Sequence, residues 1–288
     1  MVNQTPDQPT HEYDWQNPNR KTFDFGRVFG NTFSSFFGNF KRLLIPLLIA
    51  TFVLAVFSTV TQAAMTDQVQ AFIENPNGEN MGGYLTFTYG IQLVSFLFAV
   101  WFQLVVIHTS YSFISKNETF TENLIQKAFK YLFPVFFMAL IYIVVCIFGF
   151  LILFIGFFFV WPGWALAGPV YVIERKGVFG SLGRAWTLAN GNKRWIFLLL
   201  FILVMILFAF YLVLFSIMAV VGAASVFDPT SLDYANIDYY SPVMIFVSVL
   251  SSLVSFLVYG MFSSALTAAY IEIRGIKEGG SEISKVFS

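Results

Sequence analysis

The stretch YLFPVFFMALIYIVVCIFGFLILFIGFFFVWPGWALAGPVYVI, from Tyr131 to Ile173, contains 43 consecutive residues without a charged side chain. A single helix of this length would measure roughly 65 Å, about twice the thickness of the hydrocarbon core of a bilayer. The stretch therefore predicts two membrane-spanning helices joined by a tight turn between Gly149 and Gly156. Each half then keeps about twenty residues, which is the length that one span requires.

Four more uncharged runs flank this one and indicate the same class of protein. Of the 288 residues, 57% are hydrophobic and 11% are charged, against roughly 45–50% and ~25% in soluble domains. This composition excludes an ordinary globular enzyme. The sequence predicts an all-α, polytopic integral membrane protein with six transmembrane helices in three hairpins, at about 43–64, 85–108, 131–151, 155–173, 195–222 and 242–270.

The domain organisation follows from these spans. Residues 23–274 form the predicted transmembrane domain. Residues 1–22 are rich in Asn, Gln, Pro and Thr and poor in aliphatic side chains, so we expect a disordered cytoplasmic tail there. Residues 275–288 are expected to form a second cytoplasmic tail.

With this predicted topology, the basic residues all lie on one side of the membrane. All sixteen Lys and Arg fall on the side of the two termini, together with ten of the sixteen acids, and the other six acids fall on the opposite side. The net charge of zero therefore divides into +6 and −6. Because basic residues are enriched on the cytoplasmic side, we expect a multi-pass protein of a bacterial cytoplasmic (inner) membrane with both termini in the cytoplasm. Nothing in the charge balance points to nucleic acid.

Amphipathic cytoplasmic juxtamembrane helices are predicted before each odd-numbered span. Their apolar residues recur at helical spacing in segments that start near Phe23, Glu118 and Lys176. Thr119 and Glu122 offer a capping box for the second segment. The pattern is compatible with a threefold internal repeat, and equally with three unrelated juxtamembrane helices.

Catalytic and metal-binding patterns are absent from the sequence. Its one cysteine, Cys146, lies in an apolar run, and His11 and His108 have no neighbouring partner for a metal site or a nucleophile–base pair. We therefore expect no enzymatic activity, no cofactor and no metal. An enzyme would instead require Glu174, His108 and Arg175 to cluster in the fold.

Five charged residues at the predicted cytoplasmic rim are the candidate site. They are Glu174, Arg175, Arg184, Glu272 and Arg274. Pairs such as Glu174 with Arg274 would lock helix ends together, and the alternative is contact of the arginines with lipid phosphates.

The last span carries a face of small polar residues, Ser248, Ser252, Ser255 and Ser263. Small residues allow close approach of transmembrane helices, so this is the candidate helix-packing face. Pro162 and Pro169 are expected to break the fourth span. A polar substrate path is the alternative, and it predicts a cavity between the hairpins lined by these serines, Gln92 or Gln103.

Three stretches resemble the glycerophosphoryl diester phosphodiesterase membrane domain family. They are Pro169–Arg175 (PVYVIER), Gly180–Gly191 (GSLGRAWTLANG) and Ala268–Gly279 (AAYIEIRGIKEG), with Glu272 where the family typically has Asp and Trp186 where it often has a small residue. The resemblance implies a stand-alone bacterial membrane domain, since only some members carry a soluble phosphodiesterase domain. Phosphodiesterase activity is not expected of this chain.

The functional expectation is a non-enzymatic protein that binds lipid, organises the membrane or serves as an accessory subunit of a membrane complex. The alternative is a transporter-like protein that moves a lipid or other amphiphile. Membrane lipids are the expected partners, and the sequence does not choose between a membrane-protein partner and a homo-oligomer.

The threading makes a direct prediction about topology. Green fluorescent protein fused after Ser288 should fluoresce, because the C-terminus is expected in the cytoplasm, and alkaline phosphatase fused there should be inactive. Phosphatase fused after Asp228 should be active, because this residue lies in the predicted loop between the fifth and sixth spans, on the side opposite the cytoplasm. An active phosphatase after Ser288 would overturn the six-span threading.

Overall fold

A computed structural model describes residues 22–74, 81–116, 123–153, 155–226 and 242–278. Every regular element within these ranges is helical, which confirms the predicted all-α class. The helices are α1 (Phe25–Gly38), α2 (Phe40–Glu74), α3 (Met81–Ser115), α4 (Leu124–Leu153), α5 (Ile155–Trp164), α6 (Ala167–Glu174), α7 (Gly177–Ala189), α8 (Lys193–Val226) and α9 (Pro242–Glu278).

Five of these helices are long and apolar enough to cross a membrane, so the protein is a helical membrane protein. The spanning parts are Phe40–Thr61, Tyr89–Ser115, Leu124–Leu151, Lys193–Val213 and Ile245–Glu278. The predicted fourth span, 155–173, is formed by two helices of 10 and 8 residues, α5 and α6. Each is shorter than the roughly 20 residues of a span. The count of six spans stays a prediction.

Pro169 explains why the fourth segment divides in two. Proline has no N–H, and its ring clashes with the carbonyl of the residue four positions earlier, which here is Ala165. The helix accordingly stops at Trp164 and restarts at Ala167, so that Pro169 lies in the first turn of α6. Pro162 is accommodated inside α5. The predicted break therefore occurs at Pro169.

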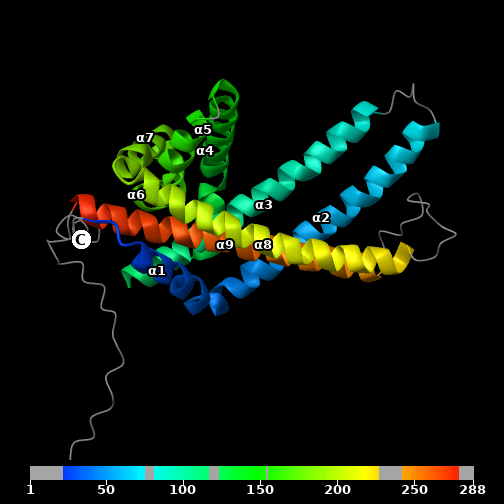
Figure 1. The fold of residues 1–288 in the computed structure, drawn as a ribbon, viewed down its shortest axis with the longest axis horizontal. Coiled ribbons are helices and arrows are strands. Elements are labelled where there is room, and N and C mark those ends of the chain that lie inside the picture. The colour runs from blue at the N-terminus through cyan, green and yellow to red at the C-terminus, as the bar shows by residue number, and fades with distance from the viewer. Residues whose placement is uncertain (1–21, 75–80, 117–122, 154, 227–241, 279–288) are drawn as a thin grey trace, which may run out of the picture.

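The helices pack tightly at one end of the molecule and diverge from it. In Figure 1, α1, α6, α7 and the C-terminal end of α9 gather at this end, while the pairs α2–α3, α4–α5 and α8–α9 extend away from it in different directions. We call it the basic end because Arg27, Arg184 and Arg274 lie there.

Helix α1 is embedded in the basic end. Asp24 caps it by accepting a hydrogen bond from the backbone N–H of Arg27 at 3.0 Å. The buried face of α1 packs on α9 and α3. Its other face carries a row of neighbouring rings, Phe25, Phe29, Phe33 and Phe37, with centroids 4.8–6.2 Å apart; the first and last pairs are stacked and the middle pair is tilted. The predicted N-terminal helix is therefore present, and its buried face combines the apolar Val28 and Phe36 with the hydroxyl residues Thr32 and Ser35.

Ser264 of α9 joins three helices through hydroxyl hydrogen bonds. Its Oγ lies 2.6 Å from Ser35 Oγ of α1 and accepts from Ser110 Oγ of α3 at 3.1 Å. The same hydroxyl donates to the carbonyl of Thr32 at 3.0 Å. All four residues are buried, so this junction ties α1, α3 and α9 together where water is excluded.

Glycines allow the closest approaches between helices. A Cβ on Gly260 of α9 would lie 2.4 Å from Cε2 of Phe36. One on Gly163 of α5 would lie 2.5 Å from the ring of Trp186, which attaches α7 to α5. At both positions only a hydrogen leaves room for the aromatic ring.

The other predicted boundaries have mixed outcomes. The third juxtamembrane helix is present as α7, but the second is continuous with α4 instead of separate. Residues 275–278 of the predicted C-terminal tail belong to α9. Residues 65–74 and 81–84, predicted to form the loop between the first two spans, belong instead to α2 and α3, and residues 223–226 after the fifth predicted span belong to α8. Residues 75–80 and 227–241 of the predicted loops, the capping box at Thr119, and the tails up to residue 21 and from residue 279 lie outside the described residues.

The junction at Ser264 is testable by comparison with its neighbour. Ser264→Ala should lower the free energy of unfolding by about 1–2 kcal/mol, because it removes a hydroxyl shared by three helices. Ser263→Ala should change it by less than about 0.5 kcal/mol, since that hydroxyl bonds only to the Tyr259 carbonyl of its own helix. Unfolding in detergent by SDS titration measures both. Equal effects would contradict the assigned role of Ser264.

Candidate functional site

Glu174, the last residue of α6, is the centre of an ion-pair network at the basic end. Its carboxylate accepts a hydrogen bond from Arg184 Nε of α7 at 3.1 Å and forms a salt bridge with Lys176 Nζ at 2.9 Å. It also accepts a hydrogen bond from the Tyr270 hydroxyl of α9 at 3.0 Å. The side chain is only 6% exposed, so these contacts replace water around the carboxylate.

Arg274 and Glu278 extend the network along α9. Arg274 donates from Nη1 to the Tyr270 hydroxyl at 2.9 Å and from Nε to Glu278 at 2.7 Å. Arg184 also pairs with Glu278. The five side chains Glu174, Arg184, Tyr270, Arg274 and Glu278 therefore form a closed ring that joins α6, α7 and α9; we call it the rim network.

The partners of Glu174 control its ionisation. Burial alone would raise the pKa of this carboxyl. The hydrogen bond from Lys176, the charge of Arg184 and the Tyr270 hydroxyl outweigh it and hold the pKa below the ordinary value of 4.5. Glu174 is therefore ionised at neutral pH, in the form that the rim network requires.

A second contact attaches α7 to α9. Lys277 Nζ donates to the carbonyls of Thr187 and Asn190 at 2.6 and 2.7 Å, at the C-terminal end of α7. Helix C-terminal carbonyls lack partners within their own helix and favour a cation. The basic end is thus held by charge at several points.

The predicted rim residues separate into three groups. Glu174, Arg184 and Arg274 lie in the rim network, although Arg274 reaches Glu174 through Tyr270 instead of directly. Glu272 lies outside it and pairs with Arg27 of α1 at 3.5 Å. Arg175 is exposed and ends α6 in a left-handed conformation with φ of 54°. Three of the five residues therefore belong to the rim network, and Glu272 joins α9 to α1 separately.

A cavity of about 350 Å³ lies where the three helix pairs meet. Its wall is formed by α3, α4, α5, α6, α8 and α9. We call it the central cavity. Its lining is mainly apolar, and the helix break contributes the small residues Ala165, Ala167 and Gly168. The volume lies near the lower end of the ~300–1,000 Å³ that is typical of ligand sites.

Few polar side chains line the central cavity. Gln103 of α3 reaches it about halfway along a spanning helix, and Tyr259 and Ser263 of α9 line it nearby. Within the part of the chain that the structure describes, the Gln103 amide has no hydrogen-bond partner. Gln92 is exposed and does not line the cavity. One of the two glutamines is therefore placed where a ligand could contact it.

The predicted serine face of the last span is largely buried. Ser248, Ser252 and Ser263 are each at most 5% exposed, as expected of a packing face. Ser255 is half-buried and lies 3.1 Å from the Tyr211 hydroxyl of α8. Ser263 also lines the central cavity, so the packing face and the cavity wall meet on α9.

His108 contacts a different set of residues from Glu174. The imidazole is buried in α3, its Nδ1 lies 2.8 Å from the Leu104 carbonyl, and the ring stacks on Tyr131 of α4. Glu174 is directed to the rim network and Arg175 is exposed. Glu174 and His108 thus have different hydrogen-bond partners, whereas the charge of Arg175 acts on His108.

Several cations around the basic end are exposed and pair with no acid within the described residues. Asp24, Glu174, Glu272 and Glu278 are each paired with a basic residue. Among the exposed cations without such a pair are Lys41, Arg42, Lys116, Lys130 and Arg175, whereas Arg194 lies over the Trp195 ring and Lys277 donates to backbone carbonyls. The first five follow α1, end α3, begin α4 and end α6, so they surround the packed end with positive charge.

Sequence reasoning missed several members of these sites. Tyr270 and Glu278 were not predicted. Each lies four residues from Arg274, a spacing that places all three on one face of a helix. Ser35, Ser110 and Ser264 carry no local signal, because each looks like any small residue of an apolar helix. Their pairing is a property of the tertiary fold.

Comparisons of this chain with protein-family models, with curated proteins and with solved structures give no match. The resemblance to the glycerophosphoryl diester phosphodiesterase membrane domain therefore stays a prediction.

Glu174 provides a test of the rim network that depends on pH. Glu174→Gln should lower the free energy of unfolding at pH 7 by about 1.5–3 kcal/mol, because charged hydrogen bonds are lost. Since the folded pKa lies below 4.5, this stabilisation is complete above that pH and is lost as the pH falls through the folded pKa.

Unfolding titrations of both proteins from pH 7 to pH 3 measure the difference. Lys176→Gln is the matched control, and it should cost less than about 1 kcal/mol because Lys176 is half-exposed. A difference between wild type and Glu174→Gln that is unchanged at pH 3 would rule out this role for the carboxylate.

Proposed function

We propose that this protein is a non-enzymatic lipid-binding membrane protein that holds the hydrocarbon chain of a membrane lipid in the central cavity. The observation that carries the proposal is the cavity itself, about 350 Å³ of mainly apolar space between helices of spanning length. An unfilled apolar space of this size forfeits the dispersion contacts of its lining. A lipid chain from the surrounding bilayer restores them without any cost of entering water.

The exposed cations favour an anionic lipid. Each Lys or Arg near an anionic headgroup layer contributes about 1 kcal/mol. Lys41, Arg42, Lys116, Lys130 and Arg175 are not engaged by acids within the described residues, so they are available to phosphate groups. A protein with this surface and cavity organises lipid, or presents it to a membrane-protein partner, without chemistry of its own.

A transporter-like protein that moves a lipid or other amphiphile is the second candidate. The Gln103 amide, which makes no hydrogen bond to any described residue, favours it, because a polar group deep in a bilayer is costly unless a ligand or another part of the protein contacts it. Transport predicts that the purified protein accelerates transbilayer movement of fluorescent phosphatidylglycerol in vesicles, whereas lipid binding alone predicts no acceleration.

Lipid retention tests the proposal. Native mass spectrometry of the purified protein should show at least one bound lipid, enriched in anionic species over the bulk membrane. Ala139→Phe fills the central cavity from α4 and should lower the bound fraction at least about fivefold. Val144→Phe adds the same ring to an exposed position on α4 and should leave retention unchanged.

Two outcomes would contradict the proposal. One is a wild-type protein with no lipid enrichment, and the other is equal retention by Ala139→Phe and Val144→Phe. Thermal unfolding of both variants in detergent establishes that they are folded before retention is compared.

A further inference from the structure

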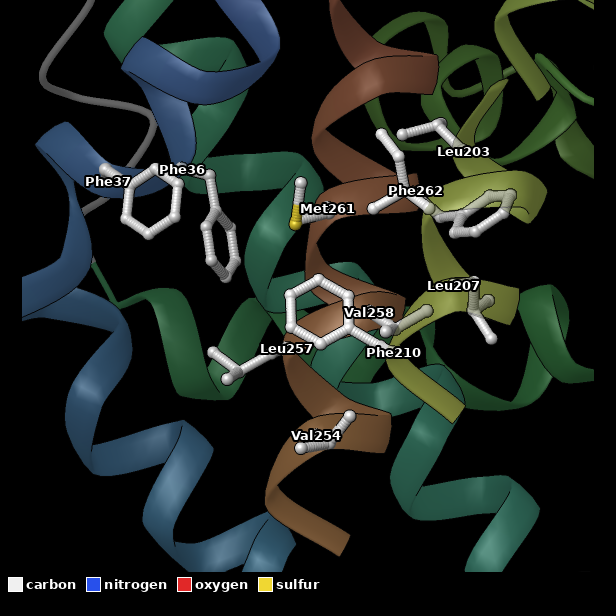
Figure 2. A pocket seen from close by; sticks show the side chains of 11 residues that line it. Phe36, Phe37, Leu203, Leu207, Phe210, Val254, Leu257, Val258, Met261 and Phe262 are labelled. Atoms are coloured by element: carbon white, nitrogen blue, oxygen red, sulfur yellow. The ribbon is translucent and has the colours of Figure 1, made fainter. Parts of the chain in front are cut away.

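A second cavity lies between α1, α8 and α9. It has a volume of about 130 Å³ and is lined only by apolar side chains of α1, α8 and α9. Figure 2 shows α9 as its floor, with Phe36 and Phe37 on one side and Leu203, Leu207 and Phe210 on the other. We call it the lateral pocket. Phe37 and Phe210 are each more than half exposed, so the pocket adjoins the surface of the protein.

The lateral pocket and the central cavity share part of their walls. Leu207 of α8 and Val258 and Phe262 of α9 line both spaces. In Figure 2 the ring of Phe262 extends from α9 toward α8, between Leu203 and Leu207. The two cavities are therefore separated by these three side chains, which we call the partition.

The partition is weakly held compared with the rest of the core. All three side chains are apolar and half-buried, so no hydrogen bond opposes their movement. Helix α8 also packs less extensively on α9 than α2 and α3 do.

We propose that Leu207, Val258 and Phe262 form a movable apolar partition through which the hydrocarbon chain of a membrane lipid passes between the lateral pocket and the central cavity. The occupant is lipid because the partition lies within the spanning parts of α8 and α9, where the pocket mouth meets the hydrocarbon of the bilayer. The lateral pocket carries no polar side chain, so it suits the chain and excludes the headgroup. This inference rests on the proposed binding of lipid in the central cavity.

Photocrosslinking in vesicles tests the passage. The probe is phosphatidylglycerol with a diazirine on its acyl chain, in vesicles of phosphatidylethanolamine and phosphatidylglycerol that contain the full chain. Wild type should form adducts both at Met261 in the lateral pocket and at Met138 in the central cavity. Phe262→Trp thickens the partition and should lower adducts at Met138 at least about fivefold while those at Met261 persist.

Two variants complete the design. Leu207→Trp thickens the partition from α8 and should reproduce the effect of Phe262→Trp, which guards against a folding defect in one variant. Phe208→Trp makes the matched change at an exposed position of α8 that lines neither cavity, and it should label as wild type does.

The outcomes separate the two proposals. Adducts at Met138 that persist in both partition variants would overturn the passage and leave lipid binding in the central cavity standing. Adducts at Met138 without any at Met261 in wild type would also overturn the passage. No adduct at Met138 in wild type would contradict lipid binding in the central cavity itself.

Discussion

A polar group inside a bilayer must find its partner within the protein, and the packing of this fold depends on how α9 meets that constraint. Ser264 forms hydrogen bonds with Ser35 of α1 and Ser110 of α3. Nearer the helix end, Tyr270 joins Glu174 of α6 to Arg274 of its own helix. Both contacts lie at the basic end. Because α9 binds its neighbours there, the helix pairs are anchored at one end and free to diverge from it (Figure 1).

This anchoring explains why the central cavity lies between the helix pairs and why a second space remains between α1, α8 and α9. Helices that are tied at one end and splayed beyond it lose side-chain contact with increasing distance from the tie. Membrane proteins gain little from burying apolar surface against each other, because lipid tails solvate it equally well. Lipid chains can therefore fill such gaps without a large penalty, and the apolar linings of the central cavity and the lateral pocket are compatible with that occupant.

The class of fold was predictable because hydropathy reports the medium around a helix. The uncharged runs identified the long helices, and Pro169 marked the break between α5 and α6. Partner choice was not predictable. Ser35 and Ser264 are 229 positions apart, and nothing local distinguishes them from other small residues of their helices. The rim was recognised as charged, but Tyr270 as the link between Glu174 and Arg274 follows only from how α6 and α9 approach each other.

The broken fourth segment connects the sequence to the candidate site most directly. A continuous helix from 155 to 173 would present an unbroken row of side chains to α3 and α9. Pro169 prevents this, and the break instead brings Ala165, Ala167 and Gly168 to the wall of the central cavity. These small residues leave volume that larger side chains would fill. Because Pro169 has no N–H, the Ala165 carbonyl also lacks its usual helical donor. Pro169 thus interrupts the fourth segment and also creates the space in which we place the lipid chain.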